Sequence, residues 1–303
     1  MTDDPAGAWL SQDDEHKLAV RFGRDLRRWL DDGTHRTAEL AERWGVEQLG
    51  PPRAGGTSVL VDGRRGSTRV VLKMTPERDI GATEGAALRF WEASPHVVDL
   101  LAEDAEEGAL LLAHVEPGAS LAQTGWTLLD VIPIVSDLFR RGLPDGSFPS
   151  VEDRVGFLIQ LTRTRLHRLA AGSTVVDLDL DAVHRRATTL AQSFRGQPHL
   201  VHGDLHPGNV LRSATAGIMA IDPRPCIGDP HFDLADWLLG PDSPDDADVR
   251  RRAEELGRHV PGVEPDRAYA WAVALAPIVA YSVGSHPSDA ARERAIQLAR
   301  LWG

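Results

Sequence analysis

The chain has 303 residues, a hydrophobic content of 42% and a formal net charge of −12. This length and apolar content predict a globular protein with a sizeable core, in one large two-lobed domain or in two ordinary domains. The acidic charge disfavours nucleic acid and anionic membranes as partners and favours a cationic partner.

The N-terminal segment, MTDDPAGAWLSQDDEHK, is acidic and polar and does not resemble a signal peptide. No apolar run reaches the roughly 18 residues that a membrane span needs. We therefore expect a cytoplasmic protein. The single cysteine, Cys226, excludes a disulfide framework and a Cys-based zinc site, and we expect it to be a buried, inert thiol.

The first fifty residues have helical periodicity. Ser11 can cap a helix with Asp14 at its third position, and apolar residues follow at helical spacing as far as Leu30. A second helix is predicted from Thr37 to about Gly45. Two hairpins come next, with strands at 58–61 and 68–73 and then within 97–115, on either side of a helix at 81–94.

A Pro-Gly break at 116–120 separates this strand-rich half from a helical half. The segment HLVHGDLHPGNVLRSATAGIMAIDP interrupts the helical half and predicts a small hairpin that carries a catalytic type of loop. The helices of the second half are predicted at 127–141, 151–170, 179–194, 246–257, 266–284 and 288–302.

The loop HGDLHPGNVL at 202–211 allows a transition-metal site. His202, Asp204 and His206 alternate, so in an extended segment they would project to one side, and such ligands suit zinc or non-haem iron. The turn at Pro207–Gly208 weakens this interpretation. It also lacks a second cluster of ligands, because only His231 lies in a comparably polar stretch.

The same loop also fits phosphoryl transfer. This reaction needs a carboxylate that orients the acceptor hydroxyl, together with oxygen ligands for Mg²⁺. Asp204 can be that carboxylate. Asn209 and Asp222, which ends an apolar strand in AIDP, can be the metal ligands.

The motifs HGDLHPGNVL and IDPRPCIGDPHFDLADW together resemble the paired signature of the aminoglycoside phosphotransferase family, in the protein-kinase-like superfamily. The second motif most resembles the branch of streptomycin 6-phosphotransferases and hydroxyurea resistance kinases. The resemblance implies an α+β, bilobal protein-kinase-like fold, with added N-terminal helices on a small β-rich lobe and a larger, mainly helical second lobe. The expected parts are an N-terminal lobe at 1–113, a hinge at 114–118 and a C-terminal lobe at 119–303.

The resemblance also implies site residues and cofactors. It assigns a lysine on an apolar strand to the nucleotide phosphates, and Lys73 is one of only two lysines in the chain. The expected cofactors are ATP or GTP and Mg²⁺. The nucleotide-binding residues are Lys73, its partner Glu84, the loop residues Gly56, Thr57 and Ser58, and the hinge backbone at His114 and Glu116; His202 and Asp233 support the catalytic loop.

The acceptor is expected to be a small, cationic, hydroxyl-bearing molecule such as a streptomycin-like antibiotic. Asp233 follows Asp222 by only 11 positions, which leaves little room for the activation segment of a protein kinase. Asp236, Asp242 and Asp246 are candidates to bind the ammonium or guanidinium groups of the acceptor. The alternatives are a kinase for hydroxyurea, a sugar or another metabolite, a kinase-fold binding protein without catalysis, and a metallohydrolase.

Overall fold

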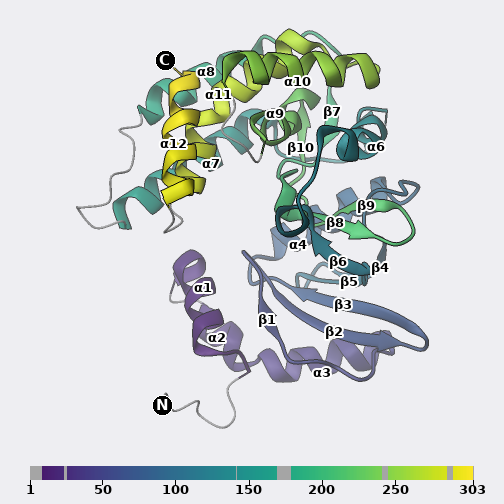
Figure 1. Cartoon of the computed structure of the whole chain (residues 1–303). Helices are drawn as coiled ribbons and strands as arrows, with labels where there is room; N and C mark the ends of the chain where they lie inside the picture. Colours follow the sequence, from purple (N-terminus) through teal and green to yellow (C-terminus); the bar gives the residue numbers. More distant parts are fainter. Residues whose placement is uncertain are drawn as a thin grey trace. The chain divides into compact units, whose positions relative to one another are not determined.

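The computed structural model describes residues 9–23, 26–140, 142–168, 179–240, 245–284 and 289–302. The chain divides into two compact units, Met1–Gly118 and Ala119–Gly303 (Figure 1). The division falls at the end of the segment 114–118 that the sequence predicts as a hinge. None of the helices within the described residues is long and apolar enough to span a membrane.

The first unit is built on a five-stranded antiparallel sheet with the order β1-β2-β3-β5-β4. Both predicted hairpins are confirmed: β2 pairs with β3, and β4 pairs with β5. The strands are β1 (Arg53–Ala54), β2 (Val59–Arg65), β3 (Thr68–Met74), β4 (Leu100–Asp104) and β5 (Ala109–Ala113).

Three helices precede the sheet: α1 (Gln12–Phe22), α2 (Leu26–Asp31) and α3 (Gly33–Trp44). Ser11 caps α1 as predicted, because its hydroxyl accepts a hydrogen bond from the backbone N–H of Asp14. The periodicity as far as Leu30 does not form one helix, because Gly23 turns the backbone with a φ of 67°.

The N-terminal helices cover one face of the sheet. Leu18, Leu26 and Leu40 share a core cluster with Val70, Leu72 and Met74 of β3. Side chains alternate along a strand, so Lys73 lies on the opposite face. The helices therefore complete the hydrophobic core of the first unit on the face away from Lys73.

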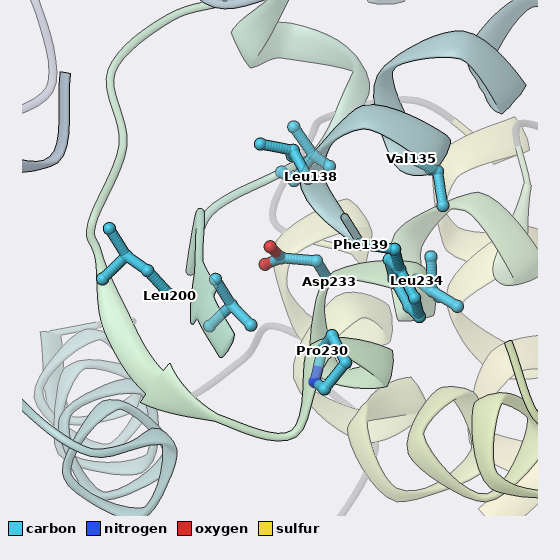
Figure 2. Close-up of a pocket in the computed structure, with 9 residues that line it drawn as sticks. Val135, Leu138, Phe139, Leu200, Pro230, Asp233 and Leu234 are labelled. Carbon is cyan, nitrogen blue, oxygen red and sulfur yellow. The ribbon is translucent and has the colours of Figure 1, made fainter. Parts of the chain in front are cut away.

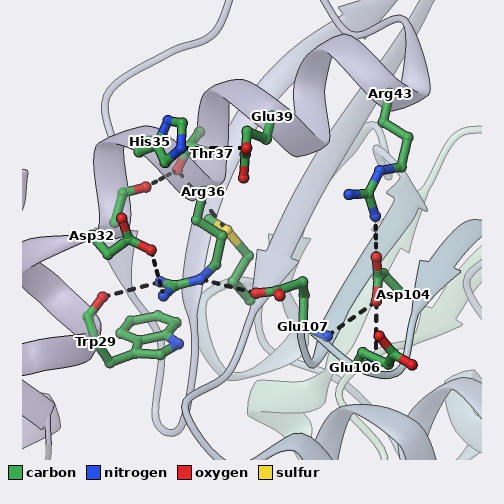
Figure 3. A network of polar contacts seen from close by, with 12 residues as sticks. Trp29, Asp32, His35, Arg36, Thr37, Glu39, Arg43, Asp104, Glu106 and Glu107 are labelled. Carbon is green, nitrogen blue, oxygen red and sulfur yellow. Dashed lines mark hydrogen bonds and ion pairs between the residues drawn. The ribbon is translucent and has the colours of Figure 1, made fainter.

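Polar contacts also hold α3 to the turn between β4 and β5 (Figure 3). The guanidinium of Arg36 donates to Glu107 at 3.2 Å and to the carbonyl of Trp29 at 3.0 Å, and its Cζ lies 4.9 Å from the Trp29 ring centroid. Arg43, which lies about two turns after Arg36 on α3, forms an ion pair with Asp104 at the end of β4. These contacts fix α3 against α2 and against the β4–β5 hairpin.

The second unit is mainly helical, and all six predicted helices are present with small shifts at their ends. Two short elements, β6 (Pro117–Ser120) and α5 (Leu121–Thr124), occupy and follow the predicted Pro-Gly break. The main helices are α6 (Leu128–Leu138), α7 (Val151–Arg168), α8 (Leu180–Gln192), α10 (Asp246–His259), α11 (Pro265–Gly284) and α12 (Asp289–Trp302).

Two small sheets carry the segment between α8 and α10. The predicted hairpin is formed by β8 (Val210–Ser213) and β9 (Gly217–Ala220), with β6 beside β8. The strand β7 (His199–Val201) pairs instead with β10 (Cys226–Gly228). Cys226 is fully buried in the core of this unit, as predicted, and burial raises the pKa of its thiol.

Candidate active site

Lys73 and Glu84 form a buried ion pair in the first unit. The ammonium of Lys73 lies 2.6 and 2.7 Å from the two carboxylate oxygens of Glu84, and the side chains are only 6% and 1% exposed. Glu84 lies on α4 (Arg78–Phe90). A Cβ at Gly81 would lie 2.9 Å from the carbonyl oxygen of Gly108, so glycine is what lets α4 approach the sheet closely enough for this contact.

The loop after β7 turns at Gly203, which has a φ of 76°. Because this left-handed residue breaks the alternation of an extended segment, His202 points inward and is fully buried, whereas the side chain of Asp204 is 31% exposed. Burial lowers the pKa of His202 to about 4. Its Nε2 lies 3.2 Å from the carbonyl oxygen of Ile221, so the buried ring connects the loop to the backbone that follows β9.

The carboxylate of Asp204 is held at both oxygens. Its Oδ1 accepts a hydrogen bond from Arg154 at 2.8 Å, and its Oδ2 accepts one from the side-chain amide of Asn209 at 3.1 Å. Arg154 was not among the predicted site residues, and it lies 50 positions from Asp204 in the chain. An isolated arginine in a chain whose basic residues are nearly all arginine gave no signal that could have identified it.

Asp233 anchors the backbone of this loop. Its two oxygens accept hydrogen bonds from the N–H groups of His202 at 2.6 Å and Gly203 at 2.8 Å. Figure 2 shows this carboxylate among apolar side chains, including Leu138 and Leu200. Burial raises the pKa of Asp233 to about 7, although the two backbone hydrogen bonds act in the opposite direction.

Asn209 directly precedes β8, and Asp222 lies two residues after β9, so the two residues flank the hairpin β8–β9. The amide nitrogen of Asn209 is used by Asp204, and none of the described residues donates a hydrogen bond to its amide oxygen. Asp222 has a φ of 57°, and its Oδ1 lies 3.0 Å from the guanidinium of Arg224. Amide and carboxylate oxygens are ligands that suit Mg²⁺, so the chemistry of this donor set fits the ion.

His206 lies on the exposed side of the loop. Its Nδ1 accepts a hydrogen bond from the N–H of Gly208 at 3.1 Å, its Nε2 lies 3.8 Å from Oδ2 of Asp204, and its side chain is 41% exposed. Its partly exposed ring thus differs from that of His202, which is fully buried. Across the described residues there is no group of three or more His, Cys, Asp or Glu side chains that could hold a metal ion.

The loop before β2 contains the three residues assigned to the nucleotide. Gly56 is exposed, Thr57 is half-buried and Ser58 is buried. The N–H of Gly55 donates to the carbonyl oxygen of Ser58 at 2.7 Å, which closes a tight turn. A Cβ at Gly56 would meet no atom within 4 Å, so the fold itself does not require glycine there.

His114 and Glu116 follow directly after β5, at the end of the first unit. Arg69 holds both side chains, with distances of 2.9 Å to Glu116 Oε1 and 3.3 Å to His114 Nε2. Within the described part of the chain, neither the carbonyl of His114 nor the N–H of Glu116 makes a backbone hydrogen bond. These two backbone groups can therefore bind a ligand.

The three acceptor candidates differ in their surroundings. Asp236 is half-buried, and burial raises its pKa, an effect that nearby His206 opposes and Asp204 reinforces. Asp246 begins α10, where Arg250 donates to it at 2.9 Å and the hydroxyl of Tyr269 also donates to it. Asp242 lies outside the described residues. Of the two candidates within the described residues, Asp236 is the one that lies near Asp204.

Comparison with known proteins identifies the family. The family model described as aminoglycoside/hydroxyurea antibiotic resistance kinase matches residues 43–283. A hydroxyurea phosphotransferase of Kitasatospora aureofaciens is 32% identical over 84% of this chain and 74% of its own length. A streptomycin 6-kinase of Streptomyces glaucescens is 27% identical over 84% of this chain and 83% of its own.

A solved structure agrees with the fold. A thermostable mutant of an aminoglycoside phosphotransferase, crystallised with ADP and hygromycin B, superimposes with a TM-score of 0.56 at 17% identity, over 88% of this chain and 97% of the other. This likeness confirms the predicted protein-kinase-like fold, with a small sheet-containing part and a helical part. The chain belongs to the aminoglycoside/hydroxyurea antibiotic resistance kinase family and is a phosphotransferase.

Proposed function

We propose that the chain transfers the γ-phosphate of ATP or GTP to a hydroxyl group of a streptomycin-like aminoglycoside and so confers resistance to it. The observation that carries the proposal is the carboxylate of Asp204, which is 31% exposed and held at both oxygens. Asp204 orients the acceptor hydroxyl and accepts its proton. Because phosphoryl transfer has a loose transition state, orientation contributes more than the strength of this base.

The nucleotide contacts belong to the first unit in this proposal. Lys73, held by Glu84, binds the phosphates, and the backbone of the loop at Gly56–Ser58 covers them. The carbonyl of His114 and the N–H of Glu116 bind the base. Support comes from the burial of the Lys73 pair and from the two backbone groups that lack intramolecular partners among the described residues.

Asn209 and Asp222 would hold Mg²⁺ through their side-chain oxygens. The ion, when bound, supplies positive charge to the transferred phosphoryl group. His202 and Asp233 take no part in the chemistry, since both are buried and support the loop that carries Asp204.

An acidic protein suits a polycationic acceptor, because the net charge of −12 attracts it over long range. Asp236 is the main candidate to bind an ammonium or guanidinium group, since it lies near Asp204. Asp246, which already has two partners, and Asp242 are secondary candidates. The streptomycin 6-kinase relative supports this choice of acceptor.

The test of Asp204 is Asp204→Ala, assayed by ADP release and by nucleotide binding. We expect turnover to fall at least about 100-fold, the usual contribution of a positioned acid or base, while nucleotide affinity stays nearly constant. Full turnover in this variant would refute the assignment. A screen with streptomycin, other aminoglycosides, hydroxyurea and simple sugars tests the acceptor, and a flat response would refute resistance while leaving the family unchanged.

Hydroxyurea is the second candidate acceptor, because a relative named hydroxyurea phosphotransferase is 32% identical to this chain. The two acceptors can be told apart at Asp236. Streptomycin is cationic, so Asp236→Asn should raise its KM, whereas uncharged hydroxyurea should be nearly unaffected. An equal change in KM for both would show that Asp236 does not recognise charge.

A further inference from the structure

Arg154 is a buried arginine in the first turn of α7. Its side chain is only 9% exposed, and a buried guanidinium must be paired and hydrogen-bonded. Its Nε donates to the carbonyl oxygen of Gly203 at 2.7 Å, and its Nη2 donates to Oδ1 of Asp204 at 2.8 Å. One planar guanidinium therefore holds the backbone and the side chain of consecutive loop residues.

The first turn of α7 is itself rigidly mounted. Ser150 and Asp153 cap the helix reciprocally, with hydrogen bonds of 2.8 and 3.0 Å. The N–H of Ile227 donates to the carbonyl oxygen of Pro149 at 2.7 Å. Ile227 lies on β10, which pairs with β7, the strand that leads into the loop. The start of α7, which carries Arg154, and the loop that Arg154 contacts are thus both attached to the β7–β10 sheet.

The contact leaves the carboxylate of Asp204 accessible. Oδ1 is bonded to Arg154 and Oδ2 to Asn209, but each carboxylate oxygen has a second lone pair. An acceptor hydroxyl can therefore bind the 31% of this side chain that is exposed. Arg154 itself is too buried to reach a substrate.

We propose that Arg154 is a positioning residue, which fixes the carboxylate of Asp204 in the orientation that the acceptor hydroxyl needs. This role rests on the proposed function of Asp204. It acts on Asp204 directly and through the carbonyl of the preceding residue, Gly203, so it should influence the chemical step and not the binding of the nucleotide.

Steady-state kinetics of Arg154→Met test the role. We expect kcat to fall about 100-fold, as for a misplaced reacting group, with the nucleotide Kd unchanged. Arg154→Lys keeps the positive charge but loses the planar guanidinium that donates to two groups at once, so kcat should fall by less than in Arg154→Met. Arg163→Met is the matched control, because Arg163 lies on the same helix but pairs with Asp181, and its kcat should not change. A kcat within twofold of wild type in Arg154→Met, or an equal loss of nucleotide affinity, would overturn the proposal.

A double-mutant cycle separates positioning from general damage. In the Asp204→Asn background, Arg154→Met should not lower the residual rate further, because the group that it positions is already changed. If the rate loss of the double variant equals the product of the losses of the two single variants, the result would contradict a role of Arg154 through Asp204.

Thermal unfolding of the same four proteins tests the contact without any substrate. Each single variant should lower Tm by several degrees, and the double variant should lower it by less than the sum. Additive shifts would overturn the proposal even if the enzyme is active. Wild-type protein that turns over no acceptor, yet shows coupled Tm shifts, would refute the proposed function and leave the contact of Arg154 with Asp204 established.

Discussion

Replacing Lys73 with methionine should destabilise the protein as well as weaken nucleotide binding. The substitution leaves the carboxylate of Glu84, whose side chain is 1% exposed, without the ammonium that now contacts both of its oxygens. Removing one partner of a buried ion pair typically costs about 3–5 kcal/mol, which is a large part of the 5–15 kcal/mol that stabilises most proteins.

The measurement is urea denaturation followed by far-UV circular dichroism. The matched control is Arg53→Met, because Arg53 pairs with Asp62 in the same unit but their side chains are 45% and 39% exposed, so we expect a loss of at most about 1 kcal/mol. Replacing both Lys73 and Glu84 with apolar residues should recover most of the lost stability but not nucleotide binding. A loss below about 1 kcal/mol in Lys73→Met alone would refute this reasoning about buried charge.

Three further substitutions test the loops. Gly203→Ala should lower Tm much more than Gly217→Ala. Both glycines have a φ of 76°, but at Gly203 the added Cβ would overlap the carbonyl of Arg224, whereas at Gly217 it would meet no atom within 4 Å. Equal losses of Tm would contradict the overlap. Gly56→Ala should leave Tm unchanged, since the added Cβ would meet no protein atom within 4 Å. It should weaken nucleotide binding, because the proposed function places the backbone of this loop over the phosphates. An unchanged nucleotide affinity would remove Gly56 from the proposed nucleotide site. Because burial lowers the pKa of His202 from 6.5 to about 4, the unfolded chain protonates this histidine in this window and the folded protein does not. The contribution of His202 to stability should therefore fall by roughly 3 kcal/mol as the pH falls from 6.5 to 4, while Asp233, with its raised pKa, contributes in the opposite direction. In His202→Gln this part of the pH dependence, measured by urea denaturation, should disappear, and its persistence would assign it to other groups.

The elements that the sequence predicted well are those with a local signal. The hairpins follow from β-branched runs on either side of turn residues, and Ser11 caps its helix because capping depends on residues three positions apart. The pairing of Lys73 with Glu84 could be predicted because a strand lysine that faces inward needs a partner on the next helix.

The contacts that escaped prediction join distant segments. Arg154 reaches Asp204 only because β10 and β7 bring the start of α7 beside the loop, and nothing in the local sequence records that pairing. The supporting role of His202 was predicted from the family resemblance and not from alternation, because its inward direction depends on the left-handed backbone of Gly203. Long-range packing and single backbone turns therefore limit what periodicity can show.

An ion pair in each of the two units bears on the proposed binding of a nucleotide. Lys73 is compensated by Glu84, and Arg224 lies 3.0 Å from Asp222, so each pair has no net charge. The phosphates of a nucleotide carry several negative charges, and two neutral pairs attract them far less than two free cations would. The proposed site therefore needs a further source of positive charge, and a divalent ion on Asn209 and Asp222 would supply it. Arg224→Gln removes the cation that competes for Asp222, so it should strengthen Mn²⁺ binding measured by electron paramagnetic resonance in the absence of nucleotide. Weaker binding in this variant would show that Arg224 orients Asp222 for the metal instead of competing with it.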